Sequence, residues 1–166
     1  SGKTTLVNSI LNEMPEDKRL FIIEQVAELQ IRDGRNHVRM ECDQDHGVTA
    51  EMALRVGMRN SPHWIISGEL RGPEAFNFLE AANTGHPGGT TIHANSHLDA
   101  LGRLEDLCIQ AGKNISLEGI RSKIGRAVKW VIHIELTDGG RRITGLCRVD
   151  GLSSDLKEYV YEDLTN

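Results

Sequence analysis

The chain has 166 residues, a formal net charge of −5 at pH 7, and a composition that is 39% hydrophobic and 26% charged. This size and composition are typical of one soluble globular domain with a buried core. No apolar run approaches the roughly 18 residues of a membrane span, and no secretory signal is visible. The acidic balance argues against direct, sequence-independent binding to nucleic acid, which needs a basic face.

The first half of the chain alternates between helical and extended patterns. Apolar residues at helical spacing predict a helix over residues 2–13. Short strands are predicted around residues 20–24, 36–42 and 63–69. A second helix is predicted over residues 48–60, with Val48, Met52 and Val56 on one face.

The second half predicts three more helices and then strands. A helix over 72–85 is started by Pro73, and a strand leaves the glycine-rich turn at 88–96. Ser96 gives a capping-box-like start to the next helix, and a further helix follows over 116–128. The core stripes of these last two helices are predicted to be Leu98, Leu101, Leu104 and Cys108, then Leu117, Ile120 and Ile124.

The last third of the sequence predicts antiparallel strands. Val128, Trp130, Ile132, Ile134 and Leu136 alternate and face one way, and Asp138-Gly139-Gly140 makes a turn. Residues 143–149 then return, and 158–163 add a last short strand. The whole pattern predicts an α/β fold: a mostly parallel sheet covered by helices on both faces, with antiparallel strands near the C-terminus.

The three cysteines are far apart, odd in number and surrounded by apolar residues. Such cysteines predict neither a disulfide framework nor a zinc site. We expect Cys42, Cys108 and Cys147 to be reduced thiols in the core of a cytosolic protein.

The chain opens with Gly2-Lys3-Thr4, the last three residues of the P-loop pattern G-x-x-x-x-G-K-[ST]. In a P-loop the lysine neutralises phosphate oxygens, the threonine hydroxyl binds Mg²⁺, and the helix N-terminus holds the phosphates. The tripeptide alone also occurs by chance. The α/β context favours the P-loop interpretation, which makes this chain a piece that begins inside the loop.

Two predicted strands end in an acid, Glu24 and Glu69. The carboxyl ends of parallel strands form one crevice, so both acids are expected near Lys3. One of them would hold Mg²⁺ or polarise the attacking water. The alternative is that both are ordinary solvated strand ends.

Histidines and an arginine follow these acids. His86 and His93 bracket a glycine-rich turn and are candidates for contacting a phosphate. Arg71 follows the second acid and would pair with Glu69, with a phosphate or across a subunit interface. The pair His93 and His97 suggests zinc, but Ala94 stands where a metalloprotease needs its general base.

The stretch GELRGPEAFNFLEAANTGHPGGTTIHANS closely resembles the secretion ATPases that power type II and type IV secretion, conjugation and pilus assembly. Four motifs of that superfamily occur in order: the end of Walker A, an Asp box (FIIEQVAEL), a Walker B ending in Gly68-Glu69, and a His box at 85–94. The motif NTGH…HAN and the later stretch VIHIELTDGGRRI are most similar to the conjugal-transfer and tight-adherence-pilus branch.

The resemblance implies a RecA-like P-loop NTPase core. Residues 1–166 would be a single C-terminal ATPase domain fragment, without its N-terminal domain and the first half of the P-loop. ATP and Mg²⁺ are the implied cofactors, and a homohexameric ring is the implied assembly. It would lie in the cytoplasm at the inner membrane and drive secretion or pilus machinery.

The resemblance also assigns roles to individual residues. Glu24 matches the Asp-box acid that activates water, Glu28 the second acid of that box, and Glu69 the Walker B acid. Which of Glu24 and Glu69 is the base stays open, and the implied metal ligands are Thr4 and Glu69. The implied nucleotide contacts are Ser1, Gly2, Lys3, Thr4, Thr5, Glu28, Arg71, His86 and His93.

Some residues depart from the family pattern. Gln25 replaces an aspartate of the Asp box, Ser61 and His63 replace an arginine and an acid, and the His box is one residue short. These departures keep two alternatives open: a pilus extension, pilus retraction or type II secretion ATPase, and a nucleotide-binding scaffold with little turnover. Losing the strand before the P-loop predicts that the isolated fragment is poorly stable and binds nucleotide weakly.

Overall fold

A computed structural model describes residues 2–165, so the predicted nucleotide contact Ser1 lies outside the described residues. The chain forms two compact units. Residues 3–70 and 84–91 make the first, called here the sheet unit. Residues 71–83 and 92–165, with Gly2, make the second, called the helical unit. The predicted single-domain organisation stays a prediction.

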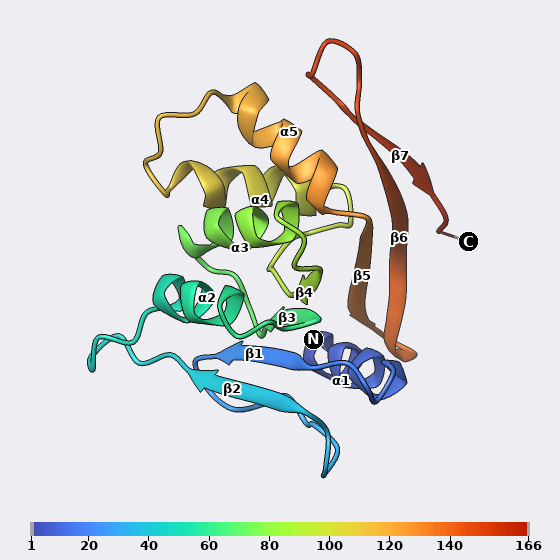
Figure 1. Cartoon of the computed structure of the whole chain (residues 1–166). Helices are drawn as coiled ribbons and strands as arrows, with labels where there is room; N and C mark the ends of the chain where they lie inside the picture. The colour runs from blue at the N-terminus through green and yellow to red at the C-terminus, as the bar shows by residue number, and fades with distance from the viewer. Residues whose placement is uncertain (1, 166) are drawn as a thin grey trace. The chain divides into compact units, whose positions relative to one another are not determined.

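The sheet unit contains a four-stranded parallel sheet in the order β2-β1-β3-β4. The strands are β1 (Leu20–Glu24), β2 (His37–Glu41), β3 (Trp64–Ser67) and β4 (Gly88–Thr90). Figure 1 shows β1 lying beside β2. Every residue of β1 is buried, because a central parallel strand is covered on both faces and therefore carries a continuous apolar run.

Helices α1 (Lys3–Glu13) and α2 (Ala50–Met58) cover opposite faces of β1. Leu20 and Ile22 share a core cluster with Leu11 of α1. The side chain of Phe21, the residue between them, points to the opposite face of the sheet. Its ring packs closely against Gly57 of α2, because a Cβ added at Gly57 would lie only 2.8 Å from Cδ1 of Phe21. The predicted parallel sheet with a helix on each face is confirmed.

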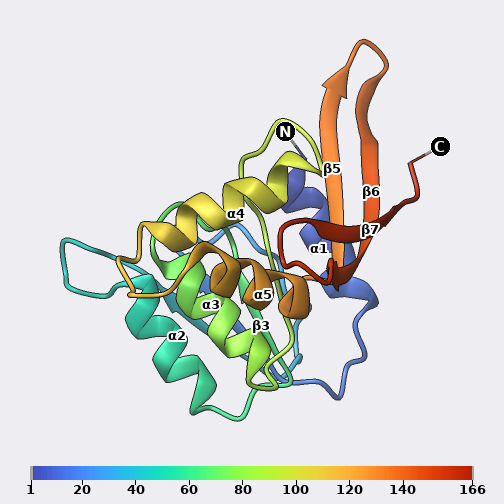
Figure 2. The same ribbon diagram turned by 90° about the horizontal axis from the view of Figure 1, so that it is seen from above.

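The helical unit combines three helices with an antiparallel sheet. The helices α3 (Glu74–Asn83), α4 (Asp99–Ile109) and α5 (Leu117–Ala127) pack against one another, as Figures 1 and 2 show. The strands β5 (Trp130–Thr137), β6 (Gly140–Leu152) and β7 (Tyr159–Asp163) pair in that order. The predicted antiparallel finish is confirmed.

Local sequence signals explain the helix starts of this unit. Ser116 Oγ accepts a hydrogen bond from Gly119 N at 3.2 Å and caps α5. Ser96 Oγ accepts from Asp99 N at 3.0 Å, although α4 itself begins only at Asp99. The hydrogen bond expected from Ser96 is present, but the N-cap residue of α4 is Leu98 and not Ser96. Leu98, predicted in the core stripe, precedes the helix and is 39% exposed.

The predicted apolar face of α2 is wrong. Met52 and Val56 are 49% and 37% exposed, whereas Ala53, Leu54 and Gly57 are buried. Small residues face the sheet because α2 approaches the ring of Phe21 closely. Leu117, placed in the core of α5 from the sequence, is likewise exposed.

The cysteine prediction is confirmed in its main point. Cys42, Cys108 and Cys147 are all buried free thiols.

Within residues 2–165 no helix combines the length and the apolarity that crossing a membrane requires.

Candidate functional site

The carboxyl edge of the parallel sheet collects the predicted acids of the sheet unit. β1 ends at Glu24, and its parallel pairing of Ile23 with Ser67 brings Gly68 alongside Glu24. Gly68 N donates a hydrogen bond to Ile23 O at 2.8 Å, and Glu69 follows directly. Two strand ends of the same direction therefore deliver Glu24 and Glu69 to one edge.

The N-terminus of α1 lies at this same edge. Thr4 Oγ1 donates a hydrogen bond to Oε2 of Glu28 at 3.3 Å, and Glu28 belongs to the loop that follows β1. The first turn of α1 carries Lys3 and no acidic residue of its own, so the helix dipole and the lysine both contribute positive charge at this end. Gly2 precedes it with a φ of +101°, a left-handed conformation that glycine adopts without strain.

Glu24 is a buried carboxylate that organises the loop after it. Its Oε1 accepts hydrogen bonds from Glu28 N at 3.0 Å and from Leu29 N at 2.8 Å. Its Oε2 forms an ion pair with Arg39, whose Nε lies 3.6 Å away, and the side chain is only 3% exposed. The carboxylate is thus occupied with protein groups, whereas Glu28 is exposed.

Gly68 is needed where β3 passes Glu24. A Cβ at this position would lie 3.2 Å from Cγ of Glu24, closer than side chains normally approach. Thr91 Oγ1 donates to Gly68 O at 2.7 Å, and Leu70 N donates to Thr91 O at 2.9 Å. The segment carrying the half-buried Glu69 is therefore fixed on both sides.

His86 is not brought to this edge. It precedes β4, whose Gly88 pairs with Ile65 near the start of β3, so it lies at the amino edge of the parallel sheet. A strand rises about 3.3 Å per residue, which separates His86 from Thr91 by roughly 16 Å. Its Nδ1 is buried without a hydrogen bond inside residues 2–165. The predicted phosphate contact of His86 stays a prediction that this register does not support.

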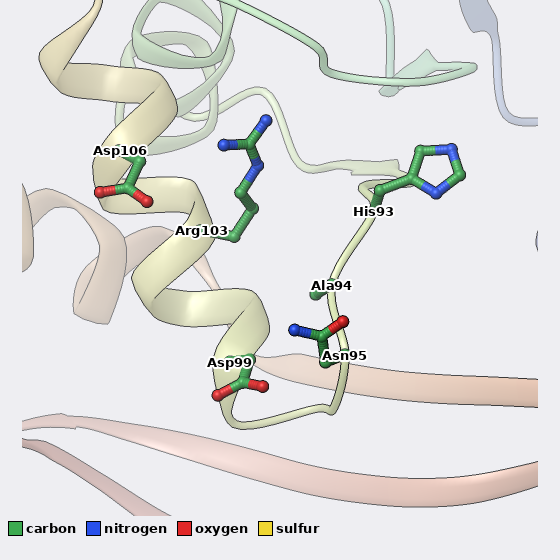
Figure 3. Close-up of a pocket in the computed structure, with 6 residues that line it drawn as sticks. All are labelled: His93, Ala94, Asn95, Asp99, Arg103 and Asp106. Atoms are coloured by element: carbon green, nitrogen blue, oxygen red, sulfur yellow. The ribbon is translucent and has the colours of Figure 1, made fainter.

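Arg71 and His93 belong to the helical unit. Arg71 is exposed, and its backbone N–H, like that of Gly72, donates to Oε1 of Glu74 at the start of α3. His93 lines an open pocket of about 380 Å³ together with Ala94, Asn95, Asp99, Arg103 and Asp106. In Figure 3 the amide of Asn95 points toward α4, whereas the imidazole of His93 points away from it. Their predicted contacts with phosphate stay predictions.

The donor set at the sheet edge suits magnesium. Among residues 2–165 there is no group of three or more His, Cys, Asp or Glu side chains placed to hold a metal ion. Mg²⁺ usually takes only one or two protein oxygens and fills its shell with water and substrate phosphates. The Thr4 hydroxyl and the carboxylates of Glu28 and Glu69 are such oxygens, so the residues present fit this ion.

The sequence interpretation missed Arg39. It appeared only as one polar residue of a predicted strand, yet its guanidinium reaches both Glu24 and the carbonyl of Leu29. The sequence did contain one sign of its role: Arg39 lies in the middle of a predicted strand, β2, that neighbours the fully buried strand β1. Its partners are not visible without the register that pairs it with Ile22.

Comparisons with known proteins agree on one family. A family model described as "Type II/IV secretion system protein" matches residues 1–157. The chain is 41% identical over 157 residues to the conjugal transfer protein TrbB of Rhizobium radiobacter, covering 91% of this chain and 46% of that protein. It is 36% identical to PtlH, a type IV secretion system protein of Bordetella pertussis, over 92% of this chain and 48% of the relative.

A solved structure supports the fold. The VirB11 ATPase of the Brucella suis type IV secretion system, in complex with sulphate, matches with a TM-score of 0.81 and 36% identity. The match covers 87% of this chain and 44% of that structure. The chain therefore spans about half the length of the relatives it matches.

Proposed function

The chain belongs to the type II/IV secretion system protein family, and we propose that it is the ATP-hydrolysing part of a motor for type IV secretion or conjugal transfer. One observation supports the proposal: the hydroxyl of Thr4, in the first turn of α1, donates a hydrogen bond to Glu28 of the Asp box, in the loop that follows the carboxyl end of β1. A positive helix terminus beside strand-end carboxylates is the arrangement that phosphoryl transfer needs.

ATP binds with its phosphates at the N-terminus of α1. The N–H groups of the first turn, including that of Thr5, and the N–H group of Gly2 donate to phosphate oxygens, and Lys3 neutralises the phosphate charge. Ser1 would add one more donor. Support comes from the absence of any acid in the first turn and from the sulphate in the VirB11 relative, a tetrahedral anion like phosphate.

Magnesium would be held by the Thr4 hydroxyl and by Glu69, and when bound it neutralises the charge that develops on the phosphates. Glu28 accepts the hydrogen bond of Thr4 and so orients that hydroxyl. Two acids were candidates for activating water. Both oxygens of Glu24 contact protein groups that order the following loop, which supports a structural role for this acid. The base role is proposed for Glu69 because it matches the Walker B acid of the family pattern.

Residues of the helical unit complete the proposal. His93 and Arg71 contact the phosphates or a neighbouring subunit, as the family pattern implies, and both are exposed. His86, at the other sheet edge, is the weakest member of the predicted set. The working form is a homohexameric ring in the cytoplasm that engages inner-membrane secretion machinery.

The test is steady-state Mg-ATPase activity of the full-length protein that carries this chain. Lys3→Ala is expected to lower turnover by at least about 100-fold and to weaken nucleotide binding, because it removes the phosphate cation. Glu69→Gln is expected to lower turnover by about 100-fold or more while nucleotide still binds. Lys18→Ala and Glu51→Gln are matched controls, since Lys18 forms a surface ion pair with Asp17 and Glu51 forms one with Arg55.

Either outcome identifies the function. Turnover that is lost in both variants and kept in both controls supports the motor. Wild-type turnover equal to that of Glu69→Gln, with nucleotide still bound, would overturn it in favour of a nucleotide-binding scaffold. Nucleotide-dependent ring assembly would then be the activity to measure.

A further inference from the structure

Arg39 joins the two ends of the loop that carries Glu28. Its Nη2 donates a hydrogen bond to the carbonyl oxygen of Leu29, and its Nε lies 3.6 Å from Oε2 of Glu24. Residues 25–28 lie between these two partners in the chain. A single guanidinium therefore contacts the residue before the loop and the residue after it.

The strand register explains how Arg39 reaches this loop. Arg39 pairs with Ile22 in parallel β2–β1 register, so its side chain lies on the same face of the sheet as those of Ile22 and Glu24. Leu29 belongs to the core cluster on that face. The long side chain runs over the sheet toward the carboxyl edge and stays three-quarters buried.

The ion pair between Arg39 and Glu24 compensates a buried negative charge. Oε2 of Glu24 is buried and has no hydrogen bond within the described part of the chain. An uncompensated buried carboxylate is strongly unfavourable, and the guanidinium of Arg39 supplies the opposite charge. The other oxygen, Oε1, then accepts the N–H groups of Glu28 and Leu29.

The loop in turn positions the acid that faces α1. Glu28 is exposed, and its side chain accepts a hydrogen bond from the hydroxyl of Thr4 at 3.3 Å. Gln30 N donates to Oδ1 of Asn8 at 2.9 Å, which ties the end of the loop to the same helix. The distance between Glu28 and Thr4 is thus set by backbone contacts that end at Glu24 and Arg39.

We infer that Arg39 is a positioning residue of the nucleotide site: through Glu24 and Leu29 it holds residues 25–29 so that the carboxylate of Glu28 meets Thr4. The inference rests on the proposed function, because it says how that site is built. A lysine cannot replace the arginine fully, since two separate nitrogens make the two contacts.

The experiment compares Arg39→Gln and Arg39→Lys with Arg55→Gln in the full-length protein. Arg55 is a matched control because it also pairs with a glutamate, Glu51, but on the surface of α2. Turnover is measured as kcat and KM, and binding as the dissociation constant of ADP. Hydrogen exchange of the amides of Glu28 and Leu29 reports on the loop.

A misplaced catalytic group typically costs 10-fold or more, so Arg39→Gln is expected to lower kcat by about 10-fold while the ADP dissociation constant changes less than about 2-fold. Arg39→Lys should be intermediate, and Arg55→Gln should match the wild type. Exchange at Glu28 and Leu29 should rise in Arg39→Gln. The effect of Arg39→Gln should also shrink in a Glu24→Gln background, because both residues act through one network.

The outcomes separate this inference from the proposed function. Unchanged kcat and unchanged loop exchange in both Arg39 variants would overturn the inference while leaving an active motor. Faster loop exchange in a protein without Lys3-dependent turnover would support the positioning network and overturn the motor. A loss of kcat together with a loss of hydrogen-exchange protection across the whole sheet unit would mean general unfolding and would also overturn the inference. Arg39→Lys is included because it retains the charge next to Glu24 and is therefore expected to keep the sheet unit folded.

Discussion

Within residues 2–165 each unit buries one glutamate, and the two glutamates have different partners. Glu24 in the sheet unit is 5% exposed and accepts backbone N–H groups from the loop that follows it. Glu105 in the helical unit is 9% exposed and accepts from the side chains of Arg121 and Tyr159. The first orders a loop that carries a further acid to a helix N-terminus, and the second joins α4, α5 and β7. Burial of a glutamate therefore does not by itself indicate a functional site; the groups that the glutamate holds in place decide whether it serves function or stability.

The largest effect on stability is expected from Glu105→Ala. Arg121 Nε donates to Glu105 Oε1 at 3.0 Å and Tyr159 Oη donates to the same atom at 2.8 Å, so the substitution leaves two donors without an acceptor. Breaking a largely buried ion pair in this way costs about 2–3 kcal/mol after allowance for the partial exposure of Arg121. Urea denaturation measures this loss, and hydrogen exchange should locate it in α5 and β7.

Asp150→Asn is the control for that substitution. Asp150 pairs with Arg148 at 3.0 Å, but both side chains are exposed, so the expected change is below about 1 kcal/mol. ATP turnover of the folded Glu105→Ala protein should equal that of the wild type. Reduced turnover at unchanged stability would instead make Glu105 functional and would break the comparison with Glu24.

A smaller, functional effect is expected from Gly68→Ala. The new Cβ would meet Cγ of Glu24 at 3.2 Å, so the carboxylate must move by a few tenths of an ångström. Such overpacking costs on the order of 1 kcal/mol of stability, and a displaced loop should lower kcat about 10-fold. Gly102→Ala is the control, since nothing lies within 4 Å of a Cβ there. If turnover survives Gly68→Ala unchanged, the position of Glu24 does not control the site.

The sequence predicted which acids lie at the carboxyl edge of the sheet, but it did not predict which side chains contact one another there. Glu24 and Glu69 were identified because each ends a short buried strand, and parallel strands place such ends together. His86 was proposed from its glycine-rich turn and not from a strand end, and it precedes β4, so it lies at the opposite edge of the sheet from a residue that follows a strand. Arg39 was missed because its partners depend on register, which a single sequence does not specify.

Helix faces show the same limit. In α4, Glu105 follows Leu101 by four residues and so lies on the predicted buried stripe, but its partners come from α5 and β7. In α2, apolar residues occur on several sides, and the large ring of Phe21 selects the face with Gly57. Helical spacing indicates which faces are possible, and packing against a distant strand decides among them.

The smallest expected effect is a loss of stability at alkaline pH that belongs to the helical unit. Burial, and then the nearby charge of Glu105, raise the pKa of the Cys108 thiol from 9.0 to about 12. Burial and the hydrogen bond to Glu105 also raise the pKa of Tyr159 above its usual value of 10.0. Between the unfolded and folded values the unfolded chain releases protons that the folded chain keeps, so stability is complete below pH 9 and falls as pH rises.

At pH 10, one unit above the ordinary thiol pKa of 9.0, the raised pKa of Cys108 lowers the free energy of unfolding by about 1–2 kcal/mol. The free energy of unfolding, measured by urea denaturation from pH 8 to 10.5, should therefore fall more steeply in the wild type than in Cys108→Ala. Tyr159→Phe should flatten the upper part of the same curve, and it should also lose about 1 kcal/mol at every pH because the hydrogen bond to Glu105 is gone. A substitution at Cys42 is the control, because that thiol belongs to the sheet unit and Glu105 belongs to the helical unit. Equal slopes in the wild type and in both helical-unit variants would mean that burial and Glu105 together do not raise the pKa values of these two groups, and the contrast between the two buried glutamates would then rest on geometry alone.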